Sequence, residues 1–166
     1  MDLATQPETI YMLKPCNHWR TEFKVGRYTV LASSYLALSN KNRVPRSSLL
    51  PSWGVYLDEG WKNVATSYPK LMIPWPDWGA IPLAQAVKLV QNIESKLQAG
   101  AVVEIGCYLG HGRTGTLLAC LLVKLEKLKP GESIAEVRRR YCQLAIEVPE
   151  QVELIHEYFS TIQSTP

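Results

Sequence analysis

The chain has 166 residues, a hydrophobic content of 46% and a net charge of +3 at pH 7. A chain of this length can bury a full core as one domain, and so mild a positive charge excludes the strongly basic class of nucleic-acid-binding proteins. The first 17 residues lack a basic segment followed by an apolar stretch, and no apolar run is long enough to span a bilayer. We therefore expect a single cytoplasmic domain over residues 1–166 with no membrane span, in which residues 1–17 form an N-terminal extension.

Short β-rich runs dominate the first half of the chain. Two runs separated by Gly26, residues 18–25 and 27–33, predict a hairpin. Residues 53–57 and 70–73 predict two further strands.

Helical patterns begin after these strands. Apolar residues recur at helical spacing between the strand at 70–73 and another β-rich run at 101–105; they are Leu83, Val87, Val90, Ile93 and Leu97. This β–α–β order predicts a right-handed parallel crossover between neighbouring strands, whose carboxyl ends then lie side by side. Three further helices are predicted, by the leucine-rich run 116–123, by a capping box that begins at Ser133, and by Pro149.

The turn between the strand at 101–105 and the next helix combines a thiol with a guanidinium. Residues 107–115 read Cys-Tyr-Leu-Gly-His-Gly-Arg-Thr-Gly, with five residues between Cys107 and Arg113. The glycines allow backbone N–H groups to point inward, and the helix N-terminus adds positive charge, so an anion should bind here. Arg113 can grip two phosphate oxygens, and the same positive field favours the thiolate form of Cys107. The turn is predicted to hold a phosphate that the sulfur attacks.

A second motif lies upstream, where residues 71–79 read Leu-Met-Ile-Pro-Trp-Pro-Asp-Trp-Gly. A short strand runs here into a loop that two prolines stiffen and Trp75 anchors, with Asp77 at its tip. Displacement of an oxygen leaving group by a thiolate needs a proton donor, and a carboxylic acid on a closable loop can serve. The alternative for Asp77 is a structural role as a helix cap or turn residue.

Together these two motifs resemble the cysteine-dependent protein tyrosine phosphatase superfamily, closest to its small dual-specificity and lipid-phosphatase-like branch. The resemblance implies a three-layer α/β fold, with a central, mostly parallel twisted sheet flanked by helices. It implies that Cys107 forms a phosphocysteine, that Arg113 and the loop amides hold the phosphoryl oxygens, and that Asp77 acts first as general acid and then as base. It also implies that Thr114 steadies the departing sulfur and that Gln151 orients the hydrolytic water. A solvated glutamine in the first turn of a helix is the alternative for Gln151.

The resemblance places substrate binding on the loop itself, through Tyr108, Leu109, Gly110, His111, Gly112 and Arg113. Gly106 stands where the family usually has a histidine, so activation of the thiol must depend on the loop, the helix end and Arg113. Leu109 replaces a common alanine and is expected to point into the core. His111 is expected to be partly exposed, with its main-chain amide binding the anion.

The predicted function is hydrolysis of phosphomonoesters through a phosphocysteine, by a protein tyrosine or dual-specificity phosphatase. Its partner would be a phosphorylated protein or peptide, and a phosphoinositide is a further substrate class. A catalytically weak phosphate-binding module is one alternative. An S-adenosylmethionine- or nucleotide-binding domain is another, since residues 110–115 also fit a Gly-x-Gly-x-x-Gly fingerprint, but it needs a strand after the next helix. Three scattered histidines and four cysteines without paired spacing predict neither a metal site nor a cofactor.

Overall fold

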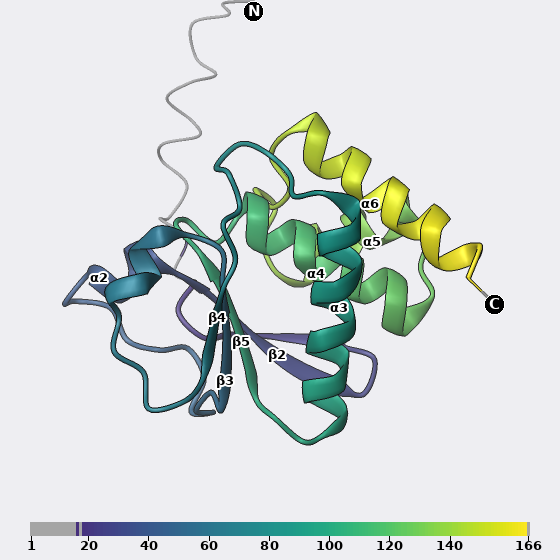
Figure 1. The fold of residues 1–166 in the computed structure, drawn as a ribbon. Helices are drawn as coiled ribbons and strands as arrows, with labels where there is room; N and C mark the ends of the chain where they lie inside the picture. Colours follow the sequence, from purple (N-terminus) through teal and green to yellow (C-terminus); the bar gives the residue numbers. More distant parts are fainter. Residues whose placement is uncertain (1–15, 17, 166) are drawn as a thin grey trace, which may run out of the picture.

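The computed structural model describes residue 16 and residues 18–165, so the predicted extension over residues 1–17 lies outside the described part except for Cys16. The centre of this part is a five-stranded sheet with strand order β1-β2-β5-β3-β4 (Figure 1). The strands are β1 (Thr21–Val25), β2 (Tyr28–Ser34), β3 (Trp53–Tyr56), β4 (Lys70–Met72) and β5 (Val103–Cys107). Strand β1 is antiparallel to β2, whereas all other neighbours pair in parallel. The predicted α/β fold with a mostly parallel sheet is confirmed.

The hairpin at the amino end forms as predicted. Gly26 has a φ of 55°, in the left-handed region that glycine adopts at low cost, and Val25 pairs with Tyr28 across the turn. The first strand begins at Thr21 and not at His18.

The long helices gather on one face of the sheet, whereas α2 (Tyr35–Ser39) lies across the strands from them (Figure 1). They are α3 (Leu83–Gln98), α4 (Gly112–Glu126), α5 (Pro130–Arg140) and α6 (Pro149–Gln163). Helices α3 and α4 contact the sheet, and α5 and α6 pack against α4. The helical layers on the two faces of the sheet are therefore unequal.

Helix α4 lies at the centre of the helical layer. Its residues 112–123 are all buried, because the sheet covers one side and α5 and α6 cover the others. A helix that is apolar on every side needs such an enclosed position. This placement fixes the first turn of α4, which follows β5 after the loop 108–111, on a rigid element.

The start of one helix differs from the sequence prediction. Helix α5 begins at Pro130 with Lys129 as N-cap, and the carboxylate of Glu132 accepts a hydrogen bond from the backbone N–H of Lys129 at 2.8 Å. Ser133 therefore lies inside the helix. A proline fits the first helical position because its missing N–H has no partner there in any case.

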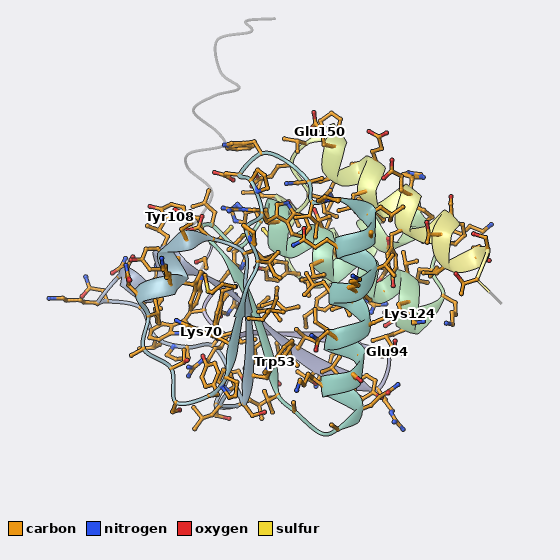
Figure 2. The ribbon with its side chains drawn as sticks, viewed as in Figure 1. Trp53, Lys70, Glu94, Tyr108, Lys124 and Glu150 are labelled. Atoms are coloured by element: carbon orange, nitrogen blue, oxygen red, sulfur yellow. The ribbon has the colours of Figure 1, made fainter. Side chains whose placement is uncertain are left out.

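The crossover between β4 and β5 also differs from the prediction, because β3 lies between these two strands. The parallel strands β2, β3, β4 and β5 still end at the same edge of the sheet. Figure 2 shows the two ends of the sheet, with Tyr108, just past β5, far from Trp53 at the start of β3. Three segments that follow strands, after β3, β4 and β5, therefore meet at one edge.

A buried carboxylate on β5 ties the strands together on the face away from the long helices. Glu104 is 1% exposed and accepts hydrogen bonds from the Tyr56 hydroxyl at 2.6 Å and the Ser33 hydroxyl at 3.0 Å. Arg20 donates to the same carboxylate from Nε at 3.2 Å, and so does the Tyr68 hydroxyl at 3.2 Å. The network stabilises the strand that ends in Cys107.

Replacement of this carboxylate should destabilise the fold. We expect Glu104→Ala to lower the free energy of unfolding by about 3 kcal/mol, because Arg20 and the Tyr56 hydroxyl lose a buried partner. Urea denaturation measures this change. The control is Glu94→Ala, since Glu94 lies 3.8 Å from Lys124 in a half-exposed ion pair and should cost less than about 1 kcal/mol. Equal losses in the two variants would show that the network contributes nothing beyond a surface pair.

Candidate active site

The loop between β5 and α4 encloses the thiol of Cys107. Cys107 ends β5 and is 2% exposed, and its sulfur accepts a hydrogen bond from the backbone N–H of Gly110 at 3.2 Å. Gly110 has a φ of 78°, which L-residues with side chains rarely adopt, so a glycine is needed for this return of the backbone. The turn therefore bends back over the sulfur, with one backbone N–H directed at it.

The guanidinium of Arg113 is held by groups from two other loops. Its Nη1 donates to the carbonyl of Leu57 at 3.0 Å and to that of Trp75 at 3.2 Å. Its Nη2 lies 3.1 Å from a carboxylate oxygen of Asp58 and 3.4 Å from one of Asp77. Because these contacts orient the planar fork in advance, a phosphate would meet a guanidinium already in place.

Asp77 is brought to this site as the sequence predicted. Its side chain is 59% exposed and lines one pocket together with Cys107 and Arg113. The preceding Trp75 is buried, and its indole N–H donates to the carbonyl of Gly79 at 2.7 Å. Trp75 therefore anchors the loop. Asp77 caps no helix of the described part, but it lies in a turn and its Oδ1 accepts a hydrogen bond from the backbone N–H of Trp78 at 3.1 Å, so a turn role stands beside its place in the pocket.

Gln151 and Thr114 lie at the same site. Gln151 is 1% exposed, accepts a hydrogen bond from the backbone N–H of Glu147 at 2.8 Å, and donates to the Gly79 carbonyl of the aspartate loop at 3.3 Å. The alternative of a solvated glutamine is wrong. The hydroxyl of Thr114 is fully buried and has no hydrogen-bond partner among the described residues, so it is free to serve another group.

Close packing explains why a glycine stands at position 106, directly before Cys107. A Cβ on Gly106 would lie 2.8 Å from the ring of Trp61, in the 3₁₀ helix η1 (Glu59–Asn63). The indole N–H of Trp61 donates to the carbonyl of Cys107 at 3.1 Å. The tryptophan therefore occupies the space of a side chain at this position and orders the backbone of Cys107.

Two loop side chains lie differently from the expectation. Leu109 is 39% exposed and does not point into the core. His111 is only 9% exposed, and its Nδ1 lies 3.6 Å from a carboxylate oxygen of Glu147. Three rings fill the core space beneath the loop. The ring centroid of His18 lies 5.1 Å from that of His111 and 4.6 Å from that of Tyr141.

The side chains of His18 and Tyr141 beneath the loop remain uncharged at pH 7. Burial, together with His111, Arg46 and Arg43, lowers the pKa of His18 to about 3. Burial also raises the pKa of Tyr141 well above its usual value, and the Tyr141 hydroxyl donates to the Gly110 carbonyl at 2.6 Å. The loop is thus held from below by a neutral hydroxyl.

Asp58 is a site residue that the sequence reasoning missed, as is Glu147, which lines the pocket. Asp58 follows β3, caps η1 by accepting from the backbone N–H of Gly60 at 2.8 Å, and contacts Arg113 more closely than Asp77 does. A signal existed, because Asp58 comes directly after a predicted strand, as the other site motifs do. Using this signal requires knowing that β3 lies next to β5 in the sheet, and the sequence near Asp58 does not reveal that.

The comparison with protein families gives one match. Residues 52–156 match the family model described as "Swiss Army Knife protein, DSP-PTPase phosphatase domain". The chain belongs to this phosphatase family. The match includes β3, β4 and β5 with the three loops that build the site.

The chain is also similar to individual proteins and to solved structures. An uncharacterized protein of Methanocaldococcus jannaschii is 38% identical over 91 residues, which are 54% of this chain and 55% of that protein. The chain thus spans about half the length of this relative. A mutant form of Tk-PTP is 27% identical with a TM-score of 0.63, over 69% of this chain and 81% of that chain. PTPMT1 in complex with PI(5)P is 21% identical with a TM-score of 0.61, over 69% and 80% of the two chains.

The described residues after β5 contain helices and no strand, so the nucleotide-binding alternative lacks the further strand that it needs. In the described part of this phosphatase-family chain, no helix is long and apolar enough to cross a membrane.

The close contact between Gly106 and Trp61 can be tested by adding one methyl group. We expect Gly106→Ala to lower the free energy of unfolding by about 1–3 kcal/mol, because the new Cβ overlaps the indole ring. Thermal or urea denaturation measures the loss. The matched control is Gly131→Ala in α5, where a Cβ meets nothing within 4 Å and the alanine should be neutral or stabilising. Unchanged stability of Gly106→Ala would contradict the proposed packing.

Proposed function

We propose that this protein hydrolyses phosphomonoesters through a phosphocysteine intermediate, with phosphotyrosine in proteins or peptides as the preferred substrate. One observation carries the proposal: Cys107 and Arg113, from the turn between β5 and α4, line one pocket together with Asp77, from the loop after β4. We place all of residues 1–166 in one catalytic domain; the pairing of β2, outside the matched range, with the strand that ends in Cys107 supports its extension to the β1–β2 hairpin.

The first step transfers the phosphoryl group to sulfur. The thiolate of Cys107, which accepts from the Gly110 N–H, attacks phosphorus while Arg113 and the loop amides hold the non-bridging oxygens. The S–P bond forms as the bond to the leaving oxygen breaks. Asp77 gives its proton to that oxygen, so the alcohol or phenol leaves neutral.

The second step returns the enzyme to its starting state. The carboxylate of Asp77 takes a proton from a water molecule that attacks phosphorus, the S–P bond breaks, and inorganic phosphate leaves. Gln151 would orient this water; its position in the first turn of α6 and its hydrogen bond to the Gly79 carbonyl of the aspartate loop support this role. The unpartnered hydroxyl of Thr114 is available to stabilise the sulfur as it departs.

The rim of the pocket favours an aromatic leaving group. Trp78 is 60% exposed and Tyr108 is 42% exposed, and both line the pocket. Exposed rings on the rim can stack on a phenol. Among the described residues that line the pocket, Asp77 and Glu147 place two carboxylates beside Arg113. Their negative charge would repel further phosphates on the substrate.

A phosphoinositide is the second substrate class, supported by the similarity of the fold to PTPMT1, whose structure contains PI(5)P. A panel of phosphotyrosine, phosphoserine and phosphothreonine peptides and of mono- and polyphosphorylated inositol lipids separates these classes. Higher kcat/KM for the lipids than for the phosphotyrosine peptides would overturn our preference.

The nucleophile is tested by a single substitution. We expect Cys107→Ser to reduce hydrolysis of a simple aryl phosphate to background, because a serine hydroxyl in this loop remains protonated. Binding of inorganic phosphate, measured by calorimetry, should persist because Arg113 and the amides remain. Retained turnover would exclude the phosphocysteine. If the unsubstituted protein binds phosphate but hydrolyses no member of the panel, the chain is a phosphate-binding module.

The role of Asp77 is tested with two aryl phosphates of different leaving-group pKa. We expect Asp77→Asn to lower kcat by about a hundredfold for a phenol of high pKa, and by much less for one of low pKa, which leaves without a proton. The matched control is Asp58→Asn, which removes a carboxylate at a similar distance from the same guanidinium. Asp58→Asn should affect both substrates equally. A leaving-group effect in Asp58→Asn and not in Asp77→Asn would assign the acid to Asp58.

A further inference from the structure

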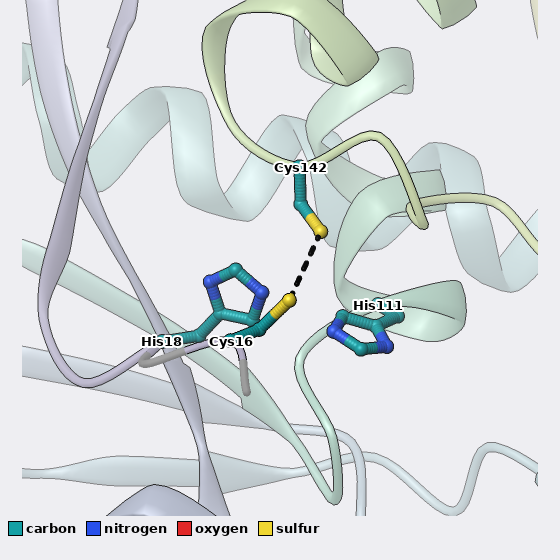
Figure 3. A group of neighbouring side chains, drawn as sticks. All are labelled: Cys16, His18, His111 and Cys142. Carbon is teal, nitrogen blue, oxygen red and sulfur yellow. Dashed lines mark hydrogen bonds between the residues drawn. The ribbon is translucent and has the colours of Figure 1, made fainter. Parts of the chain in front are cut away.

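Two cysteines and two histidines meet beneath the loop between β5 and α4, which we call the phosphate loop (residues 107–113). The proposed chemistry uses none of these four side chains. They are Cys16, His18, His111 and Cys142, and one potential ligand atom from each lies within 4.8 Å of the others. Figure 3 shows them converging from three parts of the chain: the segment before β1, the phosphate loop, and the segment after α5. We call these four residues the Cys2His2 cluster.

The histidines of the cluster lack partners. Both ring nitrogens of His18 and Nε2 of His111 are buried and have no hydrogen-bond partner among the described residues. His18 is 4% exposed, so water does not replace a partner readily. A buried ring nitrogen without a partner costs free energy, and native structures contain few of them. Coordination of a metal ion would use these lone pairs.

The sulfurs have the separation of two zinc ligands. Sγ of Cys16 lies 3.8 Å from Sγ of Cys142 (dashed line in Figure 3). A Zn–S bond of about 2.3 Å places two sulfurs about 3.8 Å apart in a tetrahedron. A disulfide needs about 2.05 Å and would leave the histidine nitrogens without partners. The distance and the donor set both favour a metal over a disulfide.

A carboxylate supports one ligand from outside. Nδ1 of His111 lies 3.6 Å from Oε1 of Glu147, on the other side of the ring from the unpartnered Nε2. Metal-binding histidines commonly direct their second ring nitrogen to a carboxylate, which fixes the orientation of the ring. Glu147 is itself held by the hydrogen bond from its backbone N–H to Gln151 at 2.8 Å.

We propose that the Cys2His2 cluster is a structural Zn²⁺ site that fastens the segment before β1 and the segment after α5 to the phosphate loop. Two thiolates and two imidazoles in a tetrahedron are a typical zinc donor set. Four protein ligands leave no open position, so the ion has no part in the hydrolysis. The sequence suggested no metal site because no two of the cysteines have paired spacing, and only the fold assembles the four ligands.

The site is tested on the full chain, reduced, stripped of metal with a chelator and handled without oxygen. Zn²⁺ titrated against a chromogenic chelator should bind at one ion per chain. It should raise the thermal midpoint by about 5–10 °C at a hundredfold excess over its Kd. Co²⁺ in its place should give the intense visible and near-ultraviolet bands of a tetrahedral thiolate site. This spectrum needs no substituted protein, so it tests the site even if a variant fails to fold.

The variants assign the ligands. Cys16→Ala and Cys142→Ala should each weaken Zn²⁺ binding by more than about tenfold. Two matched controls should keep the affinity: Cys120→Ala, which removes a buried thiol outside the cluster, and Cys107→Ser, which removes the nucleophile. Loss of binding in Cys107→Ser alone would place the ion on the catalytic thiol and overturn the proposal. Absence of stoichiometric binding, or a Cys16–Cys142 disulfide in protein kept from oxidants, would overturn it as well. Neither result would alter the phosphatase test.

Discussion

The contact of one guanidinium with the ends of two strands determines the geometry of the site. Arg113 is 4% exposed, and a charge so deeply buried is tolerated only with partners. Its partners are the carbonyls of Leu57 and Trp75 and the carboxylates of Asp58 and Asp77. The loops after β3 and β4 are thus held to the first turn of α4. The groups that satisfy Arg113 in the folded protein also orient its guanidinium, so the proposed grip on phosphate would depend on the same contacts as the packing.

The phosphate loop is fixed from two sides by aromatic residues. On the face away from the long helices, Trp61 fills the space beside Gly106 and donates to the carbonyl of Cys107. Beneath the loop, Tyr141 donates to the carbonyl of Gly110. The family histidine that usually precedes the nucleophile has no room here. Order in the loop comes from packing and main-chain hydrogen bonds.

His111 connects the catalytic loop with the Cys2His2 cluster. Its backbone belongs to the loop that would bind the phosphate, while its buried ring faces Cys16, His18 and Cys142. A zinc ion bound there would hold the loop from three parts of the chain at once. The stability of the loop would then depend on metal supply, while the chemistry at Cys107 would remain that of a thiolate.

The sequence by itself determined the parts of this protein that depend on neighbours along the chain. The thiol and guanidinium of the Cys107–Arg113 turn, the Asp77 loop, the helical spacing of α3 and the proline at the start of α6 all follow from local pattern and backbone chemistry. Only the tertiary structure decided that β3 lies between β4 and β5, that Asp58 pairs with Arg113, that Trp61 covers Gly106, and that four distant ligands meet. These contacts join residues far apart in sequence. Their formation depends on how strands and helices pack into one core, which local propensity does not determine.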